Sequence, residues 1–109
     1  MVIPAPLTLN RSGNGTAGAV EKGIVGVAGW YCIFTMILNV AVACTATVDN
    51  LDTGAELASG QGVAGGQIVM QWIDTNEKPA PFQLTMSAGG AWSYRLTVTR
   101  GQTPKFGGA

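Results

Sequence analysis

The feature that most constrains the fold of this chain is a long run without charge. No Asp, Glu, Lys or Arg occurs between Lys22 and Asp49, and the middle of the run reads WYCIFTMILNVAVAC over residues 30–44. A run of this length is long enough to cross a bilayer as a helix of about 20 residues. The first question is therefore whether it forms a membrane helix or the strands of a sheet core.

Side-chain alternation within this run favours a strand. Every even position from 30 to 44 is apolar, whereas the odd positions mix apolar and polar residues, and this is the pattern of a half-buried pleated strand. The flanks also lack the cluster of basic residues expected beside a membrane span. The run is longer than a usual strand, so we expect a bend near Asn39 to divide it in two. A transmembrane helix and a buried soluble helix are the alternatives.

The rest of the sequence consists of short alternating segments separated by turn-forming residues. The segment FQLTMSA and the segment AWSYRLTVTR both alternate apolar and polar residues, and Gly89-Gly90 between them predicts a hairpin turn. About seven strands are expected in total. The fold class predicted from this count is all-β: a single antiparallel β-sandwich or flattened barrel with an extended N-terminal arm.

The two ends of the chain differ from the middle. Residues 1–18 contain two prolines and three glycines, and we expect them to form an extended or flexible N-terminal arm outside the core. Residues 19–100 are expected to form the β-sandwich domain, and residues 101–109 a C-terminal tail. The apolar residues of the arm are its expected assembly contacts: Val2, Ile3, Leu7 and Leu9.

The composition argues against several kinds of chemistry. The chain has no histidine, which is the commonest general base and metal ligand, and its net charge is zero. No basic stripe is present for nucleic acid. Cys32 and Cys44 alone cannot complete a zinc site; without a recognisable secretion signal, buried thiols are favoured over a disulfide, and both remain open. We expect no enzyme, no cofactor and no metal site.

The aromatic residues raise the alternative of a binding surface, because aromatics on an exposed sheet face can stack against sugar rings. Trp72 and Trp92 fall on the apolar positions of their strands, where core packing is expected. Tyr31 lies on the mixed face of its strand. It is therefore the residue expected to make an exposed contact.

One segment carries a resemblance. TATVDNLDTGAELASG, residues 45–60, resembles a hairpin found in immunoglobulin-like β-sandwich modules of bacteria and phages, in which an Asn-x-Asp-Thr-Gly turn joins two strands. In size, composition and layout the whole chain resembles small tailed-phage virion proteins of the capsid-decoration, or cement, type. The resemblance implies a compact β-domain, often with an extended arm, that clamps capsomers as an oligomer. It transfers no site residues.

The low charge of the chain also favours a protein that works in an assembly. Only 11% of the residues are charged, compared with about 25% in soluble domains, which indicates that neighbouring subunits cover much of the exterior. We therefore expect a structural virion assembly protein, a capsid-decoration or tail component made in the host cytoplasm and located in the virion. Its expected partners are copies of itself, for example in a trimer, and a larger assembly such as a capsid, with neither nucleic acid nor membrane. The alternatives are a carbohydrate- or cell-surface-binding β-sandwich module and a small single-span membrane protein.

Overall fold

The uncharged run forms two strands, as its alternation predicts. The computed structural model describes residues 7–24, 26, 29–74 and 81–104, and in it the run is divided into β3 (Trp30–Val40) and β4 (Cys44–Asn50). Even positions of β3 from Cys32 to Val40 are buried. The break falls at residues 41–43, near Asn39 as expected. Within the described residues, no helix is long and apolar enough to cross a membrane.

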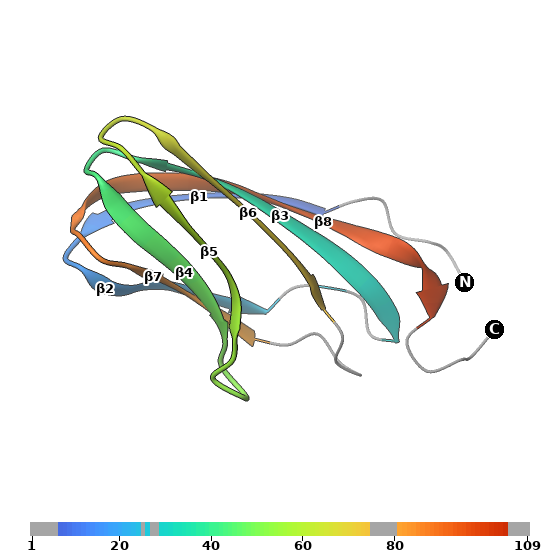
Figure 1. The fold of residues 1–109 in the computed structure, drawn as a ribbon. Helices are drawn as coiled ribbons and strands as arrows, with labels where there is room; N and C mark the ends of the chain where they lie inside the picture. Colours follow the sequence, from blue (N-terminus) through green and yellow to red (C-terminus); the bar gives the residue numbers. More distant parts are fainter. Residues whose placement is uncertain (1–6, 25, 27–28, 75–80, 105–109) are drawn as a thin grey trace.

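The chain is all-β, and its strands form the two layers of a sandwich (Figure 1). The described residues contain eight strands, one more than the approximate count from the sequence. The remaining six are β1 (Leu7–Gly15), β2 (Gly18–Ile24), β5 (Glu56–Gly62), β6 (Gln67–Asp74), β7 (Pro81–Met86) and β8 (Gly90–Pro104). The first sheet has the strand order β1-β8-β3-β6 and the second sheet the order β2-β7-β4-β5.

The strand pairing is that of a jelly roll. β1 pairs with β8, β2 with β7, β3 with β6 and β4 with β5, all antiparallel. The chain is therefore one long hairpin, with the β4–β5 turn at its tip, wrapped into two sheets. Because the wrapping places successive strands in opposite sheets, β4 and β5 are the only consecutive described strands that pair with each other.

This topology corrects two expectations from the sequence. The immunoglobulin-like arrangement is wrong, since its sheets have the orders ABED and CFG, in which consecutive strands A and B pair. The hairpin predicted over residues 82–100 is also wrong, because β7 lies in the second sheet and β8 in the first. The inward residues of both segments were nevertheless predicted correctly. Alternation reports which face of a strand is buried, but not which strand lies beside it.

The chain ends also differ from the prediction. Residues 7–15 do not lie outside the domain: they form β1, the edge strand of the first sheet, paired with β8 along its whole length. An edge strand has only one neighbour and can carry Gly and polar residues that resemble an arm in sequence. At the other end β8 continues through Pro104, into the expected tail. Residues 1–6 and 105–109 lie outside the described part.

Aromatic and aliphatic side chains from both sheets fill the core. The rings of Phe34 and Trp72 stack in the first sheet with centroids 5.2 Å apart. The Trp72 ring also contacts the Phe82 ring of the second sheet, with centroids 6.3 Å apart. Leu84, Leu96 and other residues from β3, β4, β7 and β8 are fully buried around them. Trp72 and Trp92 therefore belong to the core, as predicted.

The segment TATVDNLDTGAELASG forms the β4–β5 hairpin. Asn50 is buried, and its side-chain Oδ1 accepts hydrogen bonds from the N–H groups of Asp52 and Thr53 at 2.8 and 3.3 Å. Gly54 completes the turn with φ of 75°, a conformation that favours glycine. The predicted turn is confirmed, although the topology around it is not immunoglobulin-like.

Candidate functional site

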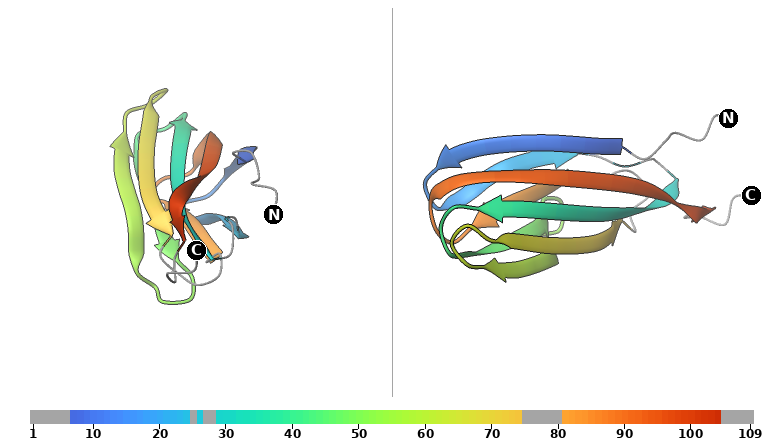
Figure 2. Two further views of the ribbon diagram at one scale, coloured as in Figure 1. Left: turned by 90° about the vertical axis from the view of Figure 1, so that its right-hand side faces the viewer. Right: turned by 90° about the horizontal axis from the view of Figure 1, so that it is seen from above.

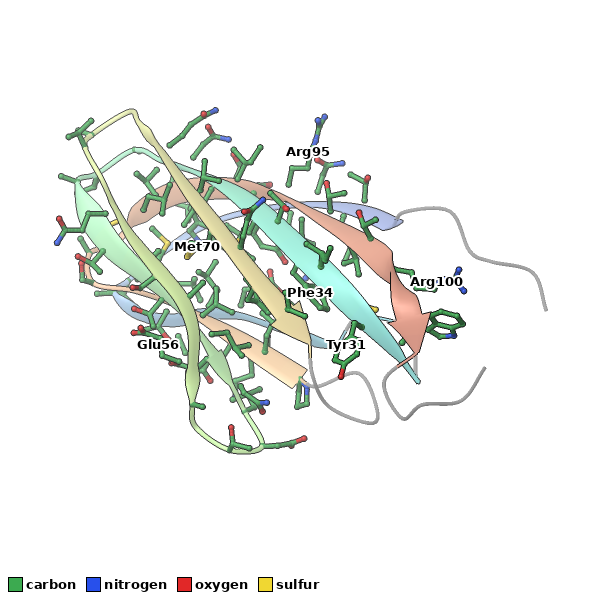
Figure 3. All side chains as sticks on the ribbon, turned by 45° about the vertical axis from the view of Figure 1, so that its right-hand side comes forward. Tyr31, Phe34, Glu56, Met70, Arg95 and Arg100 are labelled. Atoms are coloured by element: carbon green, nitrogen blue, oxygen red, sulfur yellow. The ribbon has the colours of Figure 1, made fainter. Side chains whose placement is uncertain are left out.

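The outer face of the first sheet is the candidate site, because it is broad and almost uncharged. The ladders place the outward residues of β1, β8, β3 and β6 in rows across the sheet. One row reads Ser12, Ser93, Asn39 and Gln67, and the next reads Asn10, Arg95, Ile37 and Val69. We call this surface the neutral face; Arg95 is the charged residue in these rows, and Figure 3 shows it pointing away from the sandwich.

A shallow groove runs across the neutral face. It has a volume of about 470 Å³ and crosses all four strands. Most of its lining is uncharged and polar, so it offers amide and hydroxyl groups rather than an ionic site. The lining residues are Asn10, Arg11, Ser12, Ile37, Asn39, Gln67, Ser93, Tyr94 and Arg95.

A second hollow of about 640 Å³ continues the groove toward the β7–β8 connection. Ser12, Asn39 and Ser93 line both hollows, so the two form one continuous depression. Its lining is more apolar and includes Trp92, whose buried indole lies against Gly13: a Cβ at Gly13 would stand 2.6 Å from the Trp92 Cζ2 atom. Gly13 therefore leaves room for the indole.

Exposed apolar side chains occupy the β6 side of the neutral face. Ile33 lies opposite Ile73 in the β3–β6 ladder, and Ile37 lies opposite Val69. Val69 is 60% exposed, Ile73 55% and Ile33 42%. β-Branched residues at outward positions stabilise a strand, but together they also leave apolar surface in water.

The β1–β2 side of the sandwich carries its own electrostatic contacts. Arg11 of the first sheet and Glu21 of the second form a two-contact ion pair with N–O distances of 3.1 and 3.3 Å. Glu21 and hydrogen bonding to it raise the pKa of Arg11. Burial, followed by the charge of Glu21, raises the pKa of Tyr94 to about 12. The Tyr94 phenol therefore stays protonated at neutral pH. The Arg11–Glu21 ion pair connects the two sheets.

The predicted contact residues lie apart from the groove. Val2 and Ile3 are outside the described residues. Leu7 belongs to β1 and lies opposite Val98, while Leu9 packs partly buried against the core. Leu9 is therefore a core-packing residue of an edge strand, not an anchor on a separate arm.

Tyr31 lies near the start of β3, away from Arg95 (Figure 3). It is half-buried, with the backbone of Gly101 close to it. Its neighbour Trp30 is also half-buried, and the guanidinium carbon of Arg100 sits 3.8 Å from the Trp30 ring centroid, a cation–π contact. Neither Trp30 nor Tyr31 is among the residues that line the two hollows.

The thiols do not form a reactive pair. Cys32 and Cys44 are both buried, lie in different sheets and are not joined by a disulfide. Burial raises the pKa of Cys44, which keeps it in the thiol form. The structure also shows no group of three or more His, Cys, Asp or Glu residues that could hold a metal, in the part of the chain it describes.

The groove residues could not be found from the sequence. Ser12 and Ser93 are 81 positions apart, and only the β1–β8 ladder places them opposite one another. The available signal was that Ser93, Arg95, Thr97 and Thr99 alternate with apolar residues and must face outward. Which other outward residues lie beside them depends on the strand order.

Comparisons with known proteins give a fold likeness and no family. No protein-family model matches the chain, and none of the curated proteins matches its sequence. A solved structure of a Clostridium thermocellum xylanase 10B, containing CBM22-1 and GH10 modules with xylohexaose, is similar with a TM-score of 0.51 and 20% identity over 83% of this chain. The chain spans only 21% of that structure.

A second similar structure is that of YomS, a protein derived from the SPBc2 prophage. Its TM-score is also 0.51, with 12% identity over 91% of this chain and 99% of YomS. At these identities the likeness concerns the fold alone. Fold and surface together define the class of this chain: a small antiparallel β-sandwich with an almost uncharged, partly apolar sheet face.

Proposed function

We propose that the chain is a structural protein of a phage particle, a capsid-decoration or tail component that acts by adhesion to copies of itself and to a larger assembly. The observation that carries the proposal is the neutral face, where Ile33, Val69 and Ile73 are exposed side by side with uncharged polar residues. A protein that remains alone in solution gains little from such a surface, whereas burial contributes about 25 cal/mol per Å² of apolar area.

The prophage-derived neighbour supports this proposal at the level of fold. YomS and this chain match over nearly the whole length of both. The low charge of the chain supports it independently, because like charges on identical subunits repel each other. Many weak contacts between copies would together give a lasting attachment.

The test measures whether the chain is incorporated into phage particles. A copy with a short C-terminal tag is produced in the native host while phage particles are formed, and the particles are separated on a density gradient. The proposal predicts that the tag bands with the particles and that Val69→Lys, which places a charge on the neutral face, reduces the banded amount. Lys22→Glu, on the other sheet, is the control. A tag confined to the soluble fraction would refute the virion role.

A second candidate is carbohydrate binding, favoured by the groove of amide and hydroxyl side chains. The similar xylanase structure contains a carbohydrate-binding module and a bound xylohexaose, which makes xylohexaose a suitable probe. We place this candidate second because Trp92 and Tyr94, the aromatics that border the groove, are buried. Calorimetric titration of xylohexaose, compared between the native chain and Asn39→Ala, tests it; absence of heat with the native chain excludes this ligand.

A further inference from the structure

We propose that the chain self-associates through the free edge of β6, which pairs antiparallel with the β6 strand of a second copy about a two-fold axis. The inference deepens the proposed function, on which it rests, by assigning self-association to one strand. β6 is an outer strand of the first sheet and forms a ladder with β3 only, within the described residues. The expected assembly is therefore a two-fold dimer instead of a trimer.

Backbone hydrogen bonds show which groups of β6 point to the free edge. The N–H of Val40 donates to the carbonyl of Gly66 on the β6 side, and the N–H of Ala41 donates to the carbonyl of Ala91 on the β8 side. Because successive residues of an antiparallel strand bond to opposite sides, the even residues of β3 bond to β6. Their ladder partners are Ile68, Met70 and Trp72.

The alternate residues of β6 direct their backbone away from β3. These are Val69, Gln71 and Ile73, whose side chains also lie on the neutral face. Their N–H and C=O groups form a row of donors and acceptors that the first sheet does not use. Such a row is a template for another strand.

Before its last residue, Asp74, β6 lacks the features that protect the other outer strands. β1 carries Arg11, and β2 carries Glu21 and Lys22 together with a register shift after Ala19. β5 contains two glycines, and its ladder with β4 has a register shift. From Gln67 to Ile73, β6 has no charge, proline or glycine, and its ladder with β3 shows no register shift.

The outward residues of β6 are complementary to themselves. When Gln71 lies opposite Gln71 of the second copy, Val69 lies opposite Ile73 twice, once on each side of the axis. Cross-strand pairs of β-branched residues stabilise antiparallel sheets. Ile33 and Ile37 would extend this apolar contact onto β3 of both copies.

The charge distribution on the neutral face is compatible with contact between two β6 edges. In the rows described above, Arg95 is the charged residue, and it lies on β8, two strands away from the β6 edge. A two-fold axis at Gln71 therefore brings no like charges of the described neutral face into contact. The paired area is small compared with a standard interface of about 1,600 Å², so the dimer should be weak and dependent on concentration.

The decisive variant removes one edge-directed donor. Gln71→Pro deletes an N–H that makes no bond to β3, and edge strands tolerate proline at such positions. Thr8→Pro is the matched control on β1: Thr8 lies opposite Thr97, which bonds to β3, so the Thr8 N–H also points outward. Sedimentation equilibrium should show the dimer dissociation constant raised at least about tenfold by Gln71→Pro and unchanged by Thr8→Pro. The β6 assignment would be overturned if the two variants raised the dissociation constant equally, or if neither variant changed it.

A crosslink keeps the test decisive if Gln71→Pro does not fold. In the proposed register two Gln71→Cys side chains start from Cα atoms about 5.5 Å apart, within the range of a disulfide. Mild oxidation should give a covalent dimer with Gln71→Cys and none with Thr8→Cys. The native Cys32 and Cys44 are buried and should not react. Absence of a Gln71→Cys dimer contradicts the proposal.

These results are separable from the virion proposal. A chain that is monomeric at high concentration but bands with phage particles would overturn the β6 contact and leave the virion role standing. A β6-linked dimer that is absent from particles would support the contact and overturn the virion role.

Discussion

The two sides of the sandwich are held together by different physical means. On the β5–β6 side the sheets contact each other directly, and Gly60 and Gly62 of β5 lie against Ile68 of β6. On the β1–β2 side the outer strands diverge from their connection (Figures 1 and 2), and the Arg11–Glu21 ion pair joins them. One side therefore depends on apolar packing, and the other on a partly exposed ion pair.

This difference explains how the chain could use the proposed β6 contact and stay folded. Close packing against β5 fixes the inward side chains of β6 and leaves its outward backbone available. The β1–β2 side has polar and charged outer strands, which reduce pairing with other chains. Close packing and the proposed contact with a second copy thus lie on the same side of the sandwich.

The largest expected effect is on the packed side. Ile68→Ala removes a side chain that is 2% exposed, and the cavity should lower the free energy of unfolding by about 2–5 kcal/mol. Val69→Ala, at the next position but 60% exposed, should change it by less than about 0.5 kcal/mol. Urea denaturation at low protein concentration measures both. Similar losses would mean that β6 is not packed as described.

On the β1–β2 side, the strongest effect should come from Gly13→Ala. The new Cβ would stand 2.6 Å from Trp92, whose ring is stacked on Tyr94 with centroids 5.9 Å apart, so we expect a loss of about 1–3 kcal/mol. Gly15→Ala is the control, because no atom lies within 4 Å of its Cβ position. A near-ultraviolet dichroism change should accompany Gly13→Ala only; no change for either variant would contradict the Gly13–Trp92 contact.

A smaller effect should appear in the pH dependence of stability. The pKa of Tyr94 is raised to about 12 by burial and by Glu21, whereas an unfolded tyrosine loses its proton near pH 10. The native state therefore holds the proton longer, and the free energy of unfolding should fall as the pH rises from about 10 to about 12. Tyr94→Phe should flatten this fall, as measured by urea denaturation across the range. An identical slope in both proteins would exclude Tyr94 as its source.

The smallest expected effect is that of the ion pair. Glu21→Gln removes it, but the Arg11 side chain is 58% exposed, so the unfolding midpoint should shift only slightly and less at high salt. Lys22→Gln controls for the loss of a nearby charge. The more specific result is a lower pKa for Tyr94 in Glu21→Gln, seen by ultraviolet titration. A large, salt-independent loss of stability would show that the β1–β2 side depends on this pair more than we infer.

Burial could be predicted from the sequence, but strand partners could not. The inward positions of residues 32–40, 68–72, 82–86 and 92–98 follow from alternation, and all are buried. Gly89-Gly90 indicates a change of direction; it cannot indicate whether the chain pairs with itself or crosses to the other sheet. Here it crosses, and Gly90 has a φ of 124°.

The same limit applies to β1 and to the candidate site. LTLNRSGNG has no continuous apolar alternation, because Arg11 and Gly13 occupy inward positions: Arg11 reaches Glu21, and Gly13 makes room for Trp92. Neither contact can be predicted from the sequence before the strand pairing is known. The groove and the β6 edge likewise depend on the strand order, which arises from contacts between distant residues.

Amide hydrogen exchange tests the central claim most directly, namely that the outward backbone of β6 is available in the monomer and is covered in the assembly. In dilute protein, the account predicts rapid exchange at Val69, Gln71 and Ile73 and slow exchange at Met70, which bonds to β3. Raising the concentration should slow exchange at the first three and leave the outward amides of β1, such as Thr8, unchanged. Slow exchange at Gln71 in the dilute monomer, or equal slowing at Thr8 on association, would contradict it.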